Sequence, residues 1–156
     1  GWSDAEKLPW GILLLFGGGM AIALGFETSG LALWLGEQLK LLETIPLIIL
    51  LLVIIGFVNF LTEITSNLAT TAMLLPVLVS LANATGIHYN YLLVGATVAA
   101  SCAFMLPVAT PPNAVVFGSG YLKIKDMLKI GILMNIISII LLTLIVYFIL
   151  PLLWVF

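Results

Sequence analysis

Residues 100–116 read ASCAFMLPVATPPNAVV, and the three prolines in this stretch decide how the chain can fold. Pro107, Pro111 and Pro112 fall within six residues. A proline inside a helix removes a hydrogen-bond donor and clashes with the preceding turn. The stretch therefore predicts a broken helix, in which Pro112 or Asn113 begins the next helical segment with its N-terminus facing the break. A proline kink within one packed helix is the alternative interpretation.

The break lies in a long uncharged stretch. Residues 64–122 contain no Asp, Glu, Lys or Arg, and as one helix these 59 residues would be about 88 Å long. The hydrocarbon core of a bilayer is about 30 Å thick. The stretch therefore has to fold back at least once, and its Ser, Thr, Asn, Pro and Gly residues indicate where it does so.

The composition excludes an ordinary soluble domain. Hydrophobic residues make up 63% of the 156 residues and charged residues 8%, against about 45–50% and about 25% in soluble domains. We therefore expect an all-α integral membrane protein. With no arginine and a net charge of −2, the chain offers no basic surface for nucleic acid. A single cysteine excludes an intrachain disulfide, and a single cysteine with a single histidine excludes a Cys/His metal cluster. The sequence shows no pair of nucleophile and base, so we do not expect an enzyme.

Three apolar stretches have the length of membrane spans. Leu8–Phe26 and Thr44–Thr62 each hold 19 uncharged residues, and Ile130–Phe156 holds 27. Between the first two, Thr28–Leu42 is apolar on one side and charged on the other. This pattern is typical of an amphipathic helix at the membrane interface, at about residues 28–43.

Charged residues near the ends of these stretches suggest the orientation. Three of the five lysines lie in residues 123–129, so the positive-inside rule places this segment in the cytoplasm and the C-terminus outside. The short polar N-terminus lacks the basic region of a signal peptide, and we expect the chain to start within a longer protein.

A second interruption is predicted upstream, in TEITSN at residues 62–67. Ser66 and Asn67 are favourable N-cap residues, so helix, tip and helix together predict a re-entrant hairpin. The alternative is a continuous Ser/Thr-rich helix whose hydroxyls bond its own backbone, with Glu63 paired structurally. An ionisable residue at such depth marks a functional site by default. Glu63 has no lysine nearby in sequence and would repel an anion, so we expect it to cap the tip or to bond Ser/Thr hydroxyls.

Two breaks that each present a helix N-terminus inside the membrane are typical of a secondary transporter. The positive ends of the helix dipoles favour an anion, while unwound carbonyls coordinate a cation. Residues 64–122 contain no cationic side chain other than the single histidine, so dipoles and co-bound cations have to meet the charge of an anionic substrate. We therefore expect an anion and Na⁺ as the ligand pair.

The same residues carry a resemblance to a known family. PWGILLLFGGGMAIA at residues 9–23, TEITSNLATT at residues 62–71 and ASCAFMLPVATPPNAVV at residues 100–116 resemble, in this order, the divalent anion/sodium symporter family. Members of this family carry dicarboxylates, citrate or sulfate and are much longer. The resemblance implies the second inverted repeat of a homodimeric, elevator-type transporter, with this chain as its C-terminal half.

The resemblance also implies a division of the chain. Residues 1–61 would form scaffold-type transmembrane helices with the interfacial helix, and residues 62–156 a transport-type domain. This domain would contain a re-entrant hairpin at 62–84, a broken helix at 88–122 and the last transmembrane helix at 128–154.

By the same resemblance, both breaks supply ligands. The sodium site would take backbone carbonyls of Thr62 and Ala109 and the side-chain oxygen of Asn67, with Thr65 and Asn113 as further ligands. The residues that would bind the substrate are Ser66, Asn67, Leu68, Thr110 and Pro111. Dicarboxylate carriers of the family usually have threonine at the position of Leu68. An aliphatic residue there also occurs in citrate-preferring relatives, so both substrate classes stay open.

The expected function is secondary active transport. The chain would belong to a multi-pass carrier of the plasma or inner membrane that couples Na⁺ to uptake of succinate, malate, fumarate or citrate. Its partners would be the anion, Na⁺, the lipid bilayer, a second copy and the N-terminal repeat. Two alternatives stay open: a Na⁺-independent dicarboxylate exchanger of the same fold, and a half-transporter module that does not transport.

Overall fold

The computed structural model describes residues 44–154 and, upstream, residues 1, 2, 6, 10, 14, 17, 18, 21, 24, 25, 28–31 and 34. From residue 44 on, every regular element is helical, which confirms the expected all-α class for this part of the chain. The expected span Leu8–Phe26 and the expected interfacial helix Thr28–Leu42 lie largely outside the described residues. The elements are α4 Leu47–Thr62, α5 Asn67–Thr85, α6 Tyr89–Ala100, α7 Pro111–Gly118, α8 Ile124–Leu144, η2 Ile145–Ile149 and α9 Leu150–Leu153.

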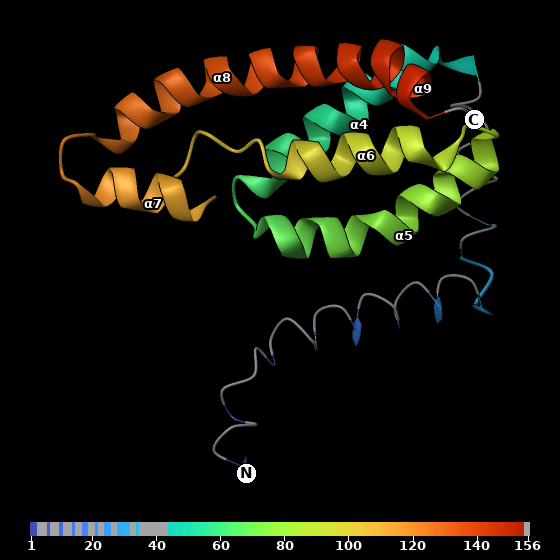
Figure 1. Cartoon of the computed structure of the whole chain (residues 1–156), viewed down its shortest axis with the longest axis horizontal. Coiled ribbons are helices and arrows are strands. Elements are labelled where there is room, and N and C mark those ends of the chain that lie inside the picture. Colours follow the sequence, from blue (N-terminus) through green and yellow to red (C-terminus); the bar gives the residue numbers. More distant parts are fainter. Residues whose placement is uncertain are drawn as a thin grey trace.

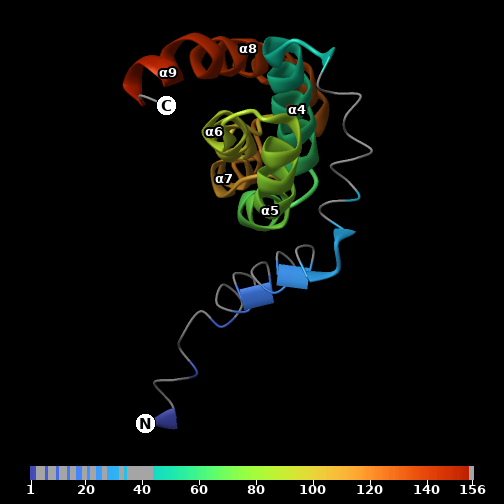
Figure 2. The same ribbon diagram turned by 90° about the vertical axis from the view of Figure 1, so that its right-hand side faces the viewer.

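Helix α6 is the centre of the bundle. It packs against both α4 and α5, while α8 packs along α4 (Figure 1). Seen from the end, α4, α5 and α6 cluster beside α8 (Figure 2). The short α7 follows the end of α6 and lies next to the first turns of α8 (Figure 1). This arrangement brings the two interrupted regions of the chain, residues 63–66 and 101–110, to the same end of α4 and α6.

An apolar core fixes α4, α6 and η2 against one another. Leu51, Ile55, Leu92 and Val146 are each at most 1% exposed. Gly95 permits this close packing, because a Cβ at its position would lie 3.3 Å from the side chain of Ile55. The core therefore makes the helices rigid supports for the interrupted regions.

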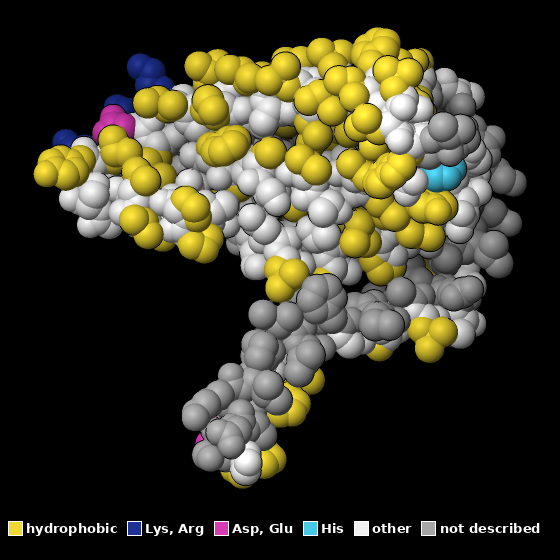
Figure 3. Space-filling view, in the orientation of Figure 1, with side chains coloured by type: hydrophobic (Ala, Val, Ile, Leu, Met, Phe, Trp, Pro, Cys, Tyr) yellow, Lys and Arg dark blue, Asp and Glu magenta, His cyan; other side chains and the backbone are white. Residues whose placement is uncertain are grey.

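The outer face of the bundle is also apolar. Many large hydrophobic side chains along α8 are exposed, and they cover much of the surface in Figure 3; examples are Ile132, Leu133, Ile136, Ile137 and Ile140. A continuous apolar surface of this kind suits contact with lipid. The helical stretches Asn67–Thr85 and Ile124–Leu153 are both long and apolar enough to cross a membrane.

Helix α4 is shorter than the span predicted for it. The predicted span Thr44–Thr62 has 19 residues, whereas the helix has 16 and is about 24 Å long. Pro46 has an extended backbone, with ψ of 136°, and precedes the first helical residue. Proline also disfavours a helical conformation in the residue before it, so the helix cannot start earlier.

The first interruption separates α4 from α5. Helix α4 ends at Thr62, and α5 starts at Asn67 after an extended Ser66. Ser66 occupies the N-cap position as expected, but its side chain makes no capping hydrogen bond. The alternative of one continuous helix through this region is therefore wrong.

The second interruption starts earlier than its prolines predict. Helix α6 already ends at Ala100, and α7 begins at Pro111 instead of at Pro112 or Asn113. Proline is well tolerated in the first turn of a helix, where its missing N–H is not needed. The hydroxyl of Thr110 caps this helix by accepting a hydrogen bond from the N–H of Asn113, at 3.3 Å. The ten-residue segment 101–110 therefore has no regular structure, and the alternative of a simple kink is wrong.

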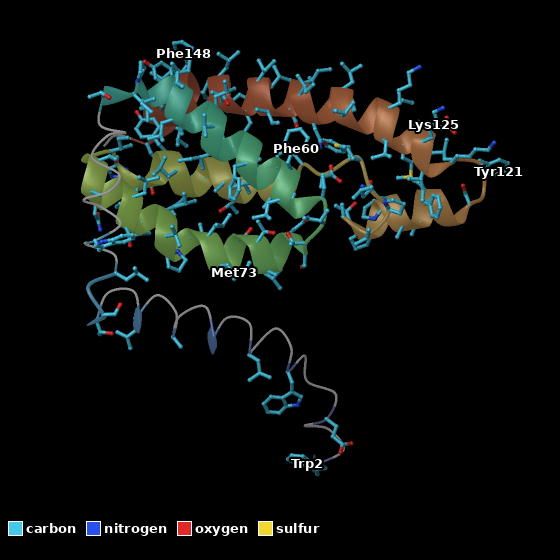
Figure 4. The ribbon with its side chains drawn as sticks, turned by 180° about the vertical axis from the view of Figure 1, so that it is seen from behind. Trp2, Phe60, Met73, Tyr121, Lys125 and Phe148 are labelled. Atoms are coloured by element: carbon cyan, nitrogen blue, oxygen red, sulfur yellow. The ribbon has the colours of Figure 1, made fainter. Side chains whose placement is uncertain are left out.

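The last helical stretch contains a feature that the sequence did not predict. It begins at Ile124, four residues before the expected start and directly before Lys125, which Figure 4 labels. The Asp126 carboxylate accepts the backbone N–H of Lys123 there, at 3.3 Å. Residues 145–149 form a π-helix just before Pro151. Proline cannot donate to the carbonyl four residues earlier, and a wider turn accommodates this loss.

Candidate functional site

Glu63 joins the two interruptions. Its side chain is 3% exposed, and its carboxylate accepts three consecutive backbone N–H groups of the segment 101–110. The N–H groups of Phe104 and Met105 donate to Oε1 at 2.8 and 2.9 Å, and that of Leu106 donates to Oε2 at 3.0 Å. A carboxylate at the end of α4 therefore replaces the helical partners that these groups lack.

Helix α8 contributes to the same contact through Asn135, which is fully buried. Its side-chain Nδ2 donates to Oε1 of Glu63 at 2.7 Å. Its Oδ1 lies 3.2 Å from the N–H of Phe104, which also donates to Glu63. The amide of Asn135 is thus bonded both to the carboxylate and to the backbone that the carboxylate holds.

The carbonyls of the second interruption also find side-chain donors. Thr62 donates to the carbonyl of Ala100 at 2.9 Å, and Asn59 donates to that of Cys102. The Nδ2 of Asn113 donates to the carbonyls of Ala103 and Leu106, both at 3.0 Å. Non-helical backbone at membrane depth requires such partners, because no bulk water is there to replace them.

A glycine lets α8 come close enough for these contacts. A Cβ at Gly131 would lie 2.5 Å from the carbonyl oxygen of Phe104 and 2.6 Å from the Cα of Met105. These contacts are with backbone atoms, which cannot turn aside as a side chain can. Gly131 therefore determines how closely α8 and the segment 101–110 pack.

The first interruption is closed by its own side chains. The Thr65 hydroxyl donates to the carbonyl of Leu61 at 2.8 Å and lies 2.5 Å from the hydroxyl of Thr70. The Thr62 hydroxyl lies 2.7 Å from the Oδ1 of Asn67, across the turn. These bonds connect residues at most five positions apart.

The Thr62 hydroxyl lies between two polar groups of the interruptions. It is within hydrogen-bond distance of both the Asn67 side-chain amide and the Ala100 carbonyl oxygen. The turn thus brings together hydroxyl, amide and carbonyl oxygens, the kind of ligands that a hard cation takes.

The residues predicted as ligands fall into two groups. Thr62, Thr65 and Asn67 lie together at the first interruption, while Ala109 and Asn113 lie at the second. Leu106 links the two groups. Its backbone N–H donates to Glu63, the residue after Thr62, and its carbonyl accepts from the side chain of Asn113. Three of the five residues predicted to bind the substrate are exposed: Ser66, Leu68 and Pro111.

Sequence reasoning missed part of this site. Glu63 bonds backbone N–H groups and an amide, where Ser/Thr hydroxyls or a cap of the tip were expected. Asn59 and Asn135 were not singled out, although each is a polar residue within an otherwise apolar run and at most 1% exposed. A buried polar residue in such a run is a signal for a functional contact, and this signal could have found both.

Comparison with known proteins identifies the class. A family model described as the sodium:sulfate symporter transmembrane region matches residues 1–155. The chain therefore belongs to this family of membrane transporters, as the resemblance predicted.

The similar curated proteins are named as transporters. A protein of Staphylococcus saprophyticus named sodium-dependent dicarboxylate transporter SdcS is 55% identical over 150 residues, which are 96% of this chain and 29% of that protein. A protein of the same name from Staphylococcus aureus strain MRSA252 is 53% identical over 150 residues, again 96% of this chain and 29% of that protein. The chain thus spans less than a third of the length of these relatives.

Proposed function

We propose that this chain forms part of a transporter that couples Na⁺ to the uptake of dicarboxylates or tricarboxylates such as succinate, malate, fumarate or citrate. The observation that carries the proposal is the oxygen-rich turn at Thr62 and Asn67, at the N-terminus of α5. Its clustered hydroxyl, amide and carbonyl oxygens suit a hard cation, and the names of the two relatives agree with sodium dependence and a dicarboxylate substrate.

The proposed sodium site takes ligands from both interruptions. Asn67 would supply its side-chain oxygen, and Thr62 and Ala109 their backbone carbonyls. The carbonyl of Thr62 is at the end of α4, where helical partners run out, and Ala109 lies in the segment without regular structure. Thr65 and Asn113 are the further ligands. Asn113 uses its Nδ2 on two carbonyls, and none of the described residues donates to its Oδ1.

The proposed anion site lies between two helix N-termini. Helices α5 and α7 both begin at an interruption, and the dipoles at their N-termini favour negative charge. The first N–H groups of α5 can also meet an anion, whereas α7 begins with two prolines, which have no N–H. Ser66, Asn67, Leu68, Thr110 and Pro111 would face the substrate. Leu68 is 37% exposed and offers no hydroxyl, so a substrate carboxylate would find one donor fewer here than threonine would provide.

The wider assembly follows the family pattern. Residues 1–61 would be scaffold-type helices, and residues 62–156 a transport-type domain with the hairpin at 62–84, the broken helix at 88–122 and the last span at 128–154. An N-terminal repeat would supply the remaining ligands. A homodimer in the plasma or inner membrane would work by an elevator motion, with residues 123–129 in the cytoplasm and the C-terminus outside.

The proposal is tested by uptake of radiolabelled succinate, citrate and sulfate into proteoliposomes, with and without an inward Na⁺ gradient. The protein used is the longest one encoded by the reading frame that contains this sequence. We expect uptake that requires the Na⁺ gradient. Uptake that needs only internal counter-substrate would instead identify an exchanger.

A matched pair of variants tests the sodium ligand. Asn67→Ala is expected to abolish Na⁺-dependent uptake at a normal protein level in the membrane. Asn83 lies in the same helix, near its other end, and is exposed, so Asn83→Ala is the control and should transport normally. Unchanged uptake by Asn67→Ala would reject this ligand set.

A further inference from the structure

We infer that Asn135 and Gly131 of α8 are positioning residues that set the sodium affinity of the site through Glu63 and the segment 101–110. The inference rests on the proposed function, because it concerns the same sodium site. Neither residue belongs to any proposed ligand set. Both act on backbone that leads directly to Ala109 and Thr110.

The two residues share one face of α8. They are four positions apart, a spacing that places side chains one above the other on a helix. Met127 and Ile139 extend this buried face in both directions. At Gly131 the face contacts the backbone of residues 104 and 105, and at Asn135 it reaches both Phe104 and Glu63.

Neither residue is a good choice for the helix itself. Glycine is among the poorest helix formers, and a buried asparagine in an apolar membrane helix is unfavourable unless its hydrogen bonds are made. An alanine at 131 and a leucine at 135 would suit α8 better. Gly131 instead allows α8 to approach the backbone of residues 104 and 105 closely. Asn135 provides one hydrogen bond to Phe104 and one to Glu63, which holds the same segment.

The segment is held on both sides at Leu106. Its N–H donates to Glu63, and its carbonyl accepts from Asn113 of α7. From this point the chain has only Pro107 and Val108 before Ala109, so a shift of residues 104–106 displaces the proposed ligand. Asn135 fixes the carboxylate that holds residues 104–106, and it therefore influences the ligand without touching the ion.

Transport measurements test the inference. In the protein used above, Asn135→Ala is expected to raise the Na⁺ concentration for half-maximal uptake about tenfold, because loss of one hydrogen bond to a charged group changes an equilibrium by about this factor. The maximal uptake rate should change less. The control Ser138→Ala removes a hydroxyl that, among the described residues, bonds only the Asn135 carbonyl of its own helix, and it should change neither quantity. Asn135→Ser keeps a donor and an acceptor and should give an intermediate shift.

A change of charge at the same position sharpens the test. Asn135→Asp would put two carboxylates in contact and is expected to remove Na⁺-dependent uptake. A half-maximal Na⁺ concentration within twofold of the parent in Asn135→Ala overturns the inference.

Cys102 provides a second measurement that does not depend on transport. It lies within the segment 101–110 and is half-buried. Alkylation of Cys102 by a maleimide, followed by mass spectrometry, should be several times faster in Asn135→Ala than in Ser138→Ala. If the parent shows no Na⁺-dependent uptake, the proposed function fails. If the parent transports but Cys102 reacts equally in both variants, only the positioning role fails.

Discussion

Two segments interrupt helices within apolar sequence: the turn at residues 63–66 and the segment at residues 101–110. They differ in how far apart in the sequence their hydrogen-bonded residues lie. Hydrogen bonds within the first interruption connect residues at most five positions apart, and the long-range bonds of Thr62 and Glu63 go to the second interruption and to Asn135. At the second, Glu63 and Asn135 reach the backbone of Phe104 from 41 and 31 positions away. The short turn is closed by its own sequence, whereas the long segment depends on three other helices, α4, α7 and α8.

This difference has an energetic reason. Four residues leave few backbone groups unpaired, and hydroxyls at the turn can bond the last carbonyls of the preceding helix. Ten residues without regular structure leave many, and each buried group without a partner costs about 1–3 kcal/mol. Local side chains cannot meet that demand, so residues of other helices do. Variants of these residues should therefore differ in severity according to the interruption they support.

The largest effect is expected for Glu63→Leu. It removes the acceptor of three backbone N–H groups and of the Asn135 amide, so the loss of stability should exceed about 3 kcal/mol. Monodisperse protein recovered after detergent extraction is the measurement. Asp126→Asn, which alters an exposed acid, should be recovered at the parent level, and an equal recovery for Glu63→Leu would contradict the central role of this carboxylate.

A smaller but clear effect is expected for Gly131→Ala. The added methyl group would overlap the backbone of residues 104 and 105, and overpacking of this kind costs about 1–3 kcal/mol. A thermal unfolding scan should show a lower midpoint. Gly56→Ala is the matched control, because its Cβ would lie 3.9 Å from Ile139, an ordinary contact. Equal midpoints for both variants would show that α8 does not need to approach so closely.

Asn59→Ala is expected to have a modest effect. The variant removes the donor to the Cys102 carbonyl, a loss of about 1 kcal/mol. It also removes the Asn59 Oδ1, a buried atom without a hydrogen-bond partner among the described residues, which lessens the loss. The thermal midpoint should fall between those of Gly131→Ala and the parent, and a larger fall than for Gly131→Ala would reverse the proposed order.

The smallest effect is expected for Thr65→Val at the first interruption. The Thr70 hydroxyl loses a partner but can turn to the Ser66 carbonyl of its own helix, so the change should be about 0.5 kcal/mol. The midpoint of unfolding is again the measurement. A fall as large as that of Gly131→Ala would mean that the first interruption is no more self-sufficient than the second.

The difference between local and long-range hydrogen bonds also explains which parts of the fold and the site the sequence could predict. Prolines and a Thr-Ser-Asn tip are local signals, and they located the first interruption and the later part of the second. The early end of α6 at Ala100 could not be read from local pattern, because the groups that compensate for the lost helix come from Glu63, Asn59 and Asn135. The roles of Gly131 and Asn135 depend on which surface faces α8, and this packing is not encoded within any single window of sequence.

The bond between Glu63 and Asn135 also has a consequence for synthesis, because it spans 72 residues. Translation proceeds at about 5–20 residues per second, so the carboxylate leaves the ribosome roughly 4–14 seconds before its partner on α8. During this interval α4 carries an acidic group that apolar surroundings do not favour. Completion of the second interruption therefore waits for the arrival of α8, and a ribosome pause just upstream of residue 135 would prolong the most vulnerable stage of membrane insertion.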